Sequence, residues 1–233
     1  MVSRMSIWND LWELFFPRYC VICGKRLSSS EECLCVGCLF SLPQTRMLLQ
    51  EENELEKNFW GRFSLGRAVS CFYYSKGGDV RKLMYELKYH GNKEIGLFMG
   101  RYMAMNLHPD FFKDMDAIIP IPLHPEKKRK RGYNQSELLA MGISQITGLP
   151  VWTDVIERVQ FTETQTHKSQ HERWMNVSTA FSRVNEYKVA GKHVLLVDDV
   201  LTTGATIIAC ADVLKEVANI KISVLTLAWA ADS

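Results

Sequence analysis

The chain has 233 residues, enough for one large domain or for one domain with a small appendage. Hydrophobic residues make up 47% and charged residues 23%, a balance that excludes disorder as the main state. Lys and Arg number 28 against 26 for Asp and Glu, so the net charge of +2 gives no general sign of a nucleic-acid binder, although a local patch can escape this average. No apolar run is long enough to predict a membrane-spanning helix.

Apolar residues near the N-terminus recur at the spacing of one helix face. They are Ile7, Trp8, Leu11, Trp12, Phe15 and Phe16. Because Asp10 and Glu13 interrupt them and no small-residue cleavage site follows, we expect an amphipathic helix rather than a signal peptide. This helix would pack on the body or on a partner. Binding to a membrane surface is the alternative, which the lack of a lysine-rich polar face disfavours. We expect a cytoplasmic protein.

Five of the seven cysteines lie between residues 20 and 38. Cys20 and Cys23 form one Cys-x-x-Cys pair, and Cys35 and Cys38 form another. Four thiolates in two such pairs predict a closed structural Zn²⁺ site, which stabilises rather than catalyses. Cys33 is an alternative third ligand, but Cys35 restores the two-residue spacing. Free or redox-active thiols are the alternative to a metal. Outside this group, we expect Cys210 to be a small core residue.

We expect three segments along the chain. Residues 1–45 would hold the N-terminal helix and the four-cysteine zinc-binding module, 46–65 an acidic polar linker, and 66–233 the main domain. In the main domain, apolar and β-branched runs predict strands at 66–74, 117–122, 151–159, 193–199 and 221–230. Helical spacing predicts helices at 77–107 (broken near Gly91), 136–146 and 205–218. This alternation predicts an α/β fold with a parallel sheet covered on both faces.

The run VLLVDDVLTTGAT, residues 194–206, carries the strongest functional pattern. A strand ends in the carboxylates of Asp198 and Asp199, and a Thr-Thr-Gly-x-Thr turn then opens a helix. A helix N-terminus binds phosphate through its unpaired N–H groups and its dipole. Carboxylates beside such a turn suit a ligand with both hydroxyls and phosphate, such as a ribose 5-phosphate. The alternative is that these residues only cap the strand–helix turn.

This run resembles the signature with which type I phosphoribosyltransferases bind 5-phosphoribosyl 1-pyrophosphate (PRPP). Two further segments make the chain similar to the ComF family, also called competence protein F: PIPLHPEKKRKRGYNQSELLA at 120–140 and ERVQFTETQTHKSQHERWMNVSTAF at 157–181. The cysteine pairs and YELKYHGN at 85–92 fit as well. The resemblance implies a parallel-sheet type I phosphoribosyltransferase-like domain with a small N-terminal zinc-binding module.

The resemblance also implies roles for individual residues. Asp198 and Asp199 would be the catalytic pair, facing the ribose hydroxyls and the waters of a bound Mg²⁺. The 5-phosphate would be wrapped by Thr202, Thr203, Gly204, Ala205 and Thr206. Pyrophosphate would lie on the loop that follows AIIPIP, at Lys127, Arg131, Gly132 and Asn134. A mobile loop within the polar stretch 160–176 would contribute Gln165, Arg173 and Asn176. Lys127 and Lys128 depart from the family, which has arginine and an apolar residue there; lysine keeps the charge but loses bidentate geometry.

The basic run KKRKR at 127–131 allows a pyrophosphate loop, a nucleic-acid patch or a solvated surface. Trp152, Trp174, Tyr133 and Phe161 could supply aromatic stacking faces near that patch. The alternative is that they are core residues, which look the same from sequence. The resemblance implies a part in natural transformation or use of external DNA, with single-stranded DNA or the uptake machinery as partner. Two functions stay open: a glycosyltransferase that transfers phosphoribosyl from PRPP, and a non-catalytic competence module that binds PRPP or single-stranded DNA.

Overall fold

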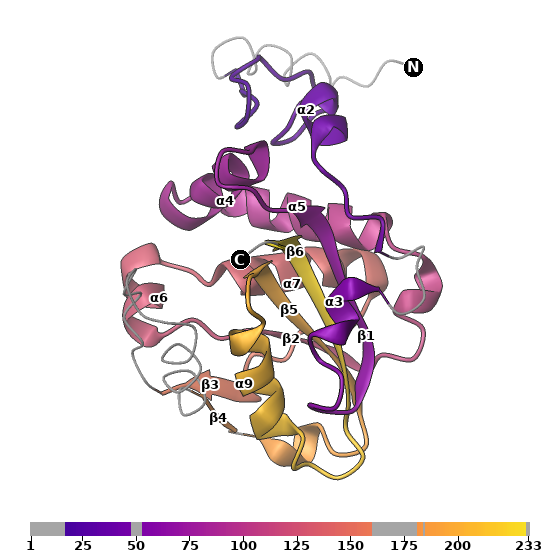
Figure 1. The fold of residues 1–233 in the computed structure, drawn as a ribbon. Coiled ribbons are helices and arrows are strands. Elements are labelled where there is room, and N and C mark those ends of the chain that lie inside the picture. Colours follow the sequence, from indigo (N-terminus) through magenta and orange to yellow (C-terminus); the bar gives the residue numbers. More distant parts are fainter. Residues whose placement is uncertain (1–16, 48–52, 160–180, 184, 232–233) are drawn as a thin grey trace, which may run out of the picture.

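A four-stranded parallel sheet forms the centre of the molecule (Figure 1). The computed structural model describes residues 17–47, 53–159, 181–183 and 185–231. Across the sheet the strands are β1 (Leu65–Tyr73), β6 (Lys221–Trp229), β5 (His193–Leu201) and β2 (Ala117–Pro120). Each neighbouring pair is parallel. The inner strands β5 and β6 are almost wholly buried, as continuous apolar runs require, so the predicted sheet is confirmed.

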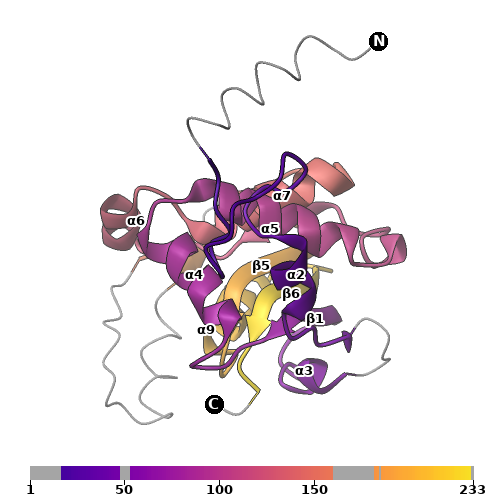
Figure 2. The same cartoon turned by 90° about the horizontal axis from the view of Figure 1, so that it is seen from above.

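Helices cover both faces of this sheet (Figure 2). On one face, α7 (Gln135–Thr147) packs on β5 and β2 and against α5 (Lys93–Met105). On the other, α9 (Ala205–Leu214) packs on β5, and α3 (Glu54–Lys57) packs on β1. Helix α4 (Asp79–Tyr89) lies at the end of the sheet toward which β5 and β6 run (Figure 1). The remaining elements are α2 (Val36–Ser41), α6 (Pro125–Arg131), β3 (Ile156–Arg158), β4 (Phe181–Arg183) and the 3₁₀ turns Pro109–Phe111 and Glu186–Lys188.

Helices α5 and α7 meet backbone to backbone. A Cβ atom at Gly100 would lie 2.2 Å from the carbonyl oxygen of Leu139, and one at Gly142 would lie 2.3 Å from that of Leu97. Because no real Cβ atom tolerates such distances, only glycine permits this crossing. The crossing lets α5 pack closely on α7, which itself packs on β5 and β2.

Two sequence expectations are refined. The helix predicted at 77–107 is divided into α4 and α5, with Gly91 in the left-handed region at φ 70°. The strand predicted at 151–159 is wrong over most of its length. Val151 makes a single bridge to Ile118, after which the chain leaves the main sheet and only β3 is extended, paired antiparallel with β4. Asp154 lies in the interruption and is held by Lys188 at 2.7 Å.

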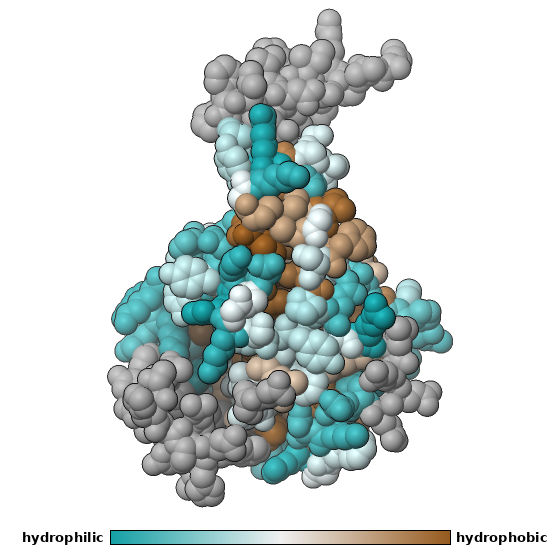
Figure 3. Space-filling model, turned by 45° about the horizontal axis from the view of Figure 1, so that its top comes forward, coloured by the Kyte–Doolittle hydropathy of each residue, from teal (hydrophilic) through white to brown (hydrophobic). Residues whose placement is uncertain are grey.

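The N-terminal part of the described chain is anchored to the body. Thr45 Oγ1 donates a hydrogen bond to the carbonyl oxygen of Ser70, and Arg101 forms an ion pair with Glu32. Within the segment expected as a linker, Asn53 donates to the Ala68 carbonyl at 2.9 Å, so α3 is held on β1. Apolar side chains gather around the neck between this module and the body (Figure 3). The division at residues 45 and 65 stays a prediction.

The helix expected in the first sixteen residues lies outside the described residues. Among the helices of the described ranges, none has the length and apolar character needed to cross a bilayer. The cytoplasmic location remains an expectation from sequence.

Candidate functional site

The two aspartates lie near the carboxyl end of β5 in a network of polar contacts. Asp198 Oδ1 accepts hydrogen bonds from Ser136 Oγ at 3.0 Å and from the Asp199 backbone N–H at 2.8 Å. Asp199 Oδ2 lies 2.9 Å from Lys88 Nζ, and the Asp199 side chain is only 7% exposed. Burial and the neighbouring charge of Asp199 raise the pKa of Asp198 to about 7. Although burial opposes the charge of Lys88, the two aspartates raise its pKa.

The turn after β5 leads directly into the N-terminus of α9. Gly204 adopts φ 76°, a left-handed conformation that favours glycine, and it precedes the first residue of α9. The Ala205 N–H donates to Thr203 Oγ1 at 3.4 Å, whereas the N-cap position itself supplies no side-chain hydrogen bond. The first turn of α9 therefore presents backbone N–H groups beside threonine hydroxyls, an arrangement that suits an anion.

Positive side chains from three elements gather around Lys88, the partner of Asp199. Burial, followed by the charges of Arg158, Arg131 and Lys88, lowers the pKa of Lys127. Burial lowers the pKa of Arg158 on β3, and the negative charge of Asp198 acts against this effect. Because like charges held this close repel one another, the cluster favours an anionic ligand that neutralises them.

The basic run forms helix α6, so the expectation of a loop is wrong. His124 Nδ1 accepts the Glu126 N–H at 3.2 Å, and Pro125 occupies the first turn. Gly132, at φ 83°, ends the helix by donating its N–H to Lys128 O at 2.7 Å. The run has no apolar period, and these two caps at its ends account for the helix. Lys128, Arg129 and Lys130 are exposed, whereas Lys127 and Arg131 are half-buried.

The residues after α6 mainly stabilise α7. Asn134 is 1% exposed; its Nδ2 donates to Ile121 O at 2.9 Å, and its Oδ1 accepts the Ser136 N–H at 3.1 Å. Tyr133 is buried and donates its hydroxyl to the Leu87 carbonyl, so of the two interpretations it is a core residue rather than a stacking face. Trp152 is half-buried beneath Lys188, at 5.0 Å. Five expected residues lie outside the described part of the chain: Gln165, Arg173, Asn176, Phe161 and Trp174.

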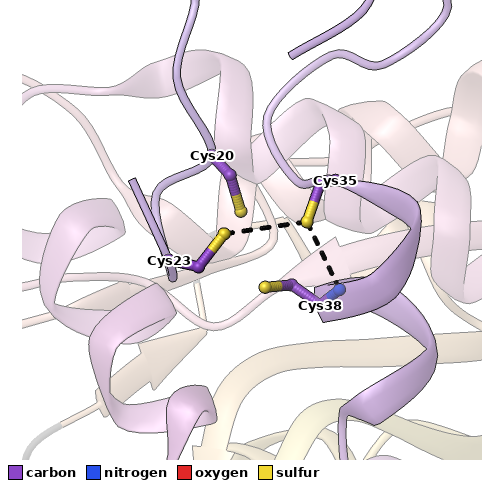
Figure 4. A group of neighbouring side chains, drawn as sticks. All are labelled: Cys20, Cys23, Cys35 and Cys38. Carbon is purple, nitrogen blue, oxygen red and sulfur yellow. Dashed lines mark hydrogen bonds between the residues drawn. The ribbon is translucent and has the colours of Figure 1, made fainter. Parts of the chain in front are cut away.

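The second cluster consists of four cysteines drawn together from two turns (Figure 4). The sulfur atoms of Cys20, Cys23, Cys35 and Cys38 all lie within 4.8 Å of one another. Cys23 Sγ and Cys35 Sγ are 3.8 Å apart, and tetrahedral Zn–S bonds of about 2.3 Å would set sulfur atoms roughly 3.8 Å apart. Although burial opposes ionisation, backbone N–H groups of Cys23, Cys35 and Ile22 lower the pKa of Cys20 to about 7. This donor set fits zinc.

The same geometry decides between Cys33 and Cys35. Cys35 belongs to the cluster, whereas Cys33 is buried outside it, and burial raises the pKa of its thiol to about 11. Cys35 also accepts the Cys38 N–H at 3.5 Å and begins α2 (Figure 4). This geometry favours Cys35 over Cys33, and the role of Cys35 as a zinc ligand stays a prediction. The core role expected of Cys210 is confirmed, since it is fully buried.

Sequence reasoning missed three side chains that contact or surround the aspartates. Ser136, Lys88 and Arg158 come from α7, α4 and β3. Their segments were part of the family resemblance, yet nothing in their local sequence distinguishes them from surface residues. Only tertiary packing brings them to Asp198 and Asp199.

Known proteins are similar to this chain over about half or most of its length. The family described as Phosphoribosyl transferase domain matches residues 127–231. Competence protein F of Haemophilus influenzae is 37% identical over 116 residues, 49% of this chain and 51% of that protein. DNA utilization protein YhgH of Escherichia coli K12 is 30% identical over 200 residues, 84% of this chain and 83% of that protein. The chain thus spans about half the length of the Haemophilus protein. The predicted phosphoribosyltransferase-type fold is confirmed.

Proposed function

Because the chain belongs to the ComF family, which includes competence protein F and DNA utilization protein YhgH, we propose that it binds PRPP and transfers its phosphoribosyl group with release of pyrophosphate. The observation that carries this proposal is that Asp198 and Asp199 directly precede the turn into α9, while Asp199 pairs with Lys88, one member of a cluster of positive side chains. Carboxylates suit the ribose hydroxyls, helix N–H groups suit the 5-phosphate, and positive side chains suit the pyrophosphate.

Each group of residues has one task in this proposal. Asp198 and Asp199 bind the ribose hydroxyls, and residues 202–206 bind the 5-phosphate through N–H groups and hydroxyls. Lys127 and Arg131 offset the negative charge that develops on the departing pyrophosphate. A Mg²⁺ ion, when bound, would add charge neutralisation and orientation, with its waters facing the aspartates. Closure over the site by 160–176, including Gln165, Arg173 and Asn176, would exclude water.

The four-cysteine cluster holds zinc in this proposal. A site with four protein ligands leaves no open position, so the metal stabilises the module rather than taking part in transfer. The donor geometry and the lowered pKa of Cys20 support this assignment.

Turnover is tested by pyrophosphate release from PRPP and Mg²⁺ in the presence of a panel of amine and heterocyclic acceptors. We expect release that depends on acceptor and is lost in Lys127→Ala with Arg131→Ala. PRPP binding without release under any acceptor would favour the second candidate, a non-catalytic PRPP-binding module acting in competence.

The exposed face of α6 favours a second partner, single-stranded DNA. Arg129 and Lys130 are consecutive exposed residues near the end of the helix, and each phosphate contact on a single strand contributes about 0.7 to the salt-dependence slope. We expect Arg129→Ala with Lys130→Ala to lower this slope by roughly 1.4. Lys113→Ala with Lys221→Ala, exposed lysines near the amino ends of strands, is the matched control. No binding at low salt would eliminate the DNA role.

A further inference from the structure

A cavity of about 540 Å³ opens beside Asp199, on the side formed by α4. Its remaining lining comes from Tyr74, Arg81, Met84, Tyr85, Lys88, Tyr89, Val200 and Thr202. This volume falls within the range of small-molecule sites, about 300–1,000 Å³. Asp199 and Thr202, both assigned above to PRPP, line one edge of the cavity, so the space is continuous with the proposed PRPP site and extends from it along α4.

Two exposed tyrosines dominate the α4 wall of this cavity. Tyr85 and Tyr89 are 53% and 66% exposed, and the four-residue spacing places them on one face of the helix. Their ring centroids are 5.0 Å apart with planes inclined by 43°. The Arg131 guanidinium lies 5.7 Å from the Tyr89 ring. Paired aromatic faces open to solvent beside a cation form a surface on which a planar ring can stack.

The tyrosine surface continues toward the four-cysteine module. A second cavity of about 390 Å³ shares Arg81 and Tyr85 with the first and extends to Gly77, Gly78 and Val21. Lys76 and Lys82 add positive charge to its wall, against one acid, Glu86. A ligand bound at Tyr85 can therefore extend an anionic group away from the aspartates.

We propose that Tyr85 and Tyr89 form a stacking subsite for the ring of a nucleobase. The inference rests on the proposed function, because it assigns the acceptor class to the cavity beside the PRPP site. Base stacking on aromatic side chains is a principal source of affinity in sequence-tolerant base binding, so these tyrosines would be the main determinants of ring binding. The base is either free or part of a strand, and the positive second cavity accommodates the phosphates of the latter.

Saturation-transfer NMR on the full chain tests ring binding with adenine and cytosine as free probes, and fluorescence anisotropy tests octadeoxycytidylate. Tyr85→Leu with Tyr89→Leu should weaken binding on the order of tenfold, within the range that stacking energies imply. Tyr85→Phe with Tyr89→Phe keeps both rings and should stay within about twofold. Tyr187→Leu, at a tyrosine that is 89% exposed elsewhere, should have no effect.

Binding of a free base identifies a small acceptor, and binding of the oligonucleotide alone identifies a base within a strand; both support the subsite. Undetectable binding of all probes, or equal binding by the leucine variant, overturns it. The PRPP-induced melting shift, measured on the same samples, should survive in the leucine variant. If PRPP binds normally and no ring probe binds, the proposed stacking subsite is rejected and the proposed function stands. Ring binding without a PRPP response removes the proposed function and, with it, the acceptor assignment.

Discussion

Asp198 is a buried carboxyl whose negative charge the fold disfavours. Burial and Asp199 raise the pKa of its carboxyl to about 7, against an unfolded value near 3.9. A carboxyl whose pKa is higher in the folded state stabilises the fold when it carries its proton. This contribution is fully present below about pH 4 and is lost as pH rises through about 7.

Asp198→Asn should therefore make the ligand-free protein more stable at pH 8, because it removes a buried charge while keeping the shape of the side chain. We expect a gain on the order of 1–3 kcal/mol in the free energy of unfolding at pH 8, and little difference near pH 4. Urea denaturation in EDTA at both pH values measures it. If the difference in unfolding free energy between the variant and wild type is the same at both pH values, Asp198 ionises at its ordinary pKa.

At this scale the sequence predicted the residues that belong to one continuous run. Asp198, Asp199 and residues 202–206 are contiguous, so a strand, a turn and a helix suffice to bring them together. Lys88 lies more than a hundred positions away, and its 2.9 Å approach to Asp199 depends on how α4 packs at the end of the sheet. Local sequence contains no information on that approach.

Among the elements, the α5–α7 crossing is the most demanding contact. Gly142→Ala should destabilise the protein by about 1–3 kcal/mol through steric overlap, although alanine is the better helix former by about 1 kcal/mol. Gly37→Ala is the matched control, because it also lies in a helix but nothing lies within 4 Å of its added Cβ. Urea denaturation should show Gly142→Ala less stable than wild type and Gly37→Ala slightly more stable. If the two variants are equally stable, α5 and α7 can move apart at no cost in the free energy of unfolding.

The cysteine module yields a test that distinguishes a ligand from a neighbour. Fresh protein should contain about one zinc per chain, and Cys38→Ser should lose it and destabilise the module, since a structural site needs all its thiolates. Cys33→Ala, at the buried cysteine outside the cluster, should keep its zinc. Elemental analysis after gel filtration measures both. Absence of zinc in wild type, or its loss from the Cys33 variant alone, contradicts the assignment.

Element types were predictable where apolar periodicity extends over a whole segment, as in β5, β6 and α7. Helix α6 was not, because its formation depends on caps at His124 and Gly132 rather than on a buried face. The strand predicted at 151–159 was too long for the opposite reason. Val151 and Ile156 both suit a strand, yet the chain turns away from the main sheet between them, so only β3 is extended. Intrinsic propensity is a weak guide where tertiary packing decides.

In the whole molecule, the parallel sheet brings the chemistry to one end. The aspartates near the end of β5, the start of α9 and the tyrosines of α4 meet where the parallel strands finish (Figure 1). Open parallel sheets generally bind ligands outside these carboxyl ends. The sequence predicted this end as the site, but it did not predict that α4 and the cysteine module border it together, with Val21 and Tyr85 lining one cavity.

The central claim, that Asp198 and Asp199 bind PRPP, is tested most directly by the melting temperature of the full chain with and without PRPP and Mg²⁺. A ligand at a hundredfold excess over its Kd stabilises the folded state by about 2.7 kcal/mol, a rise of roughly 5–10 °C for a chain of this size. We expect this rise in wild type, and its loss in the Asp198→Asn, Asp199→Asn double variant, which remains folded. If the aspartates only cap the turn, asparagine replaces them equally well, and a double variant with the full wild-type rise would contradict the account.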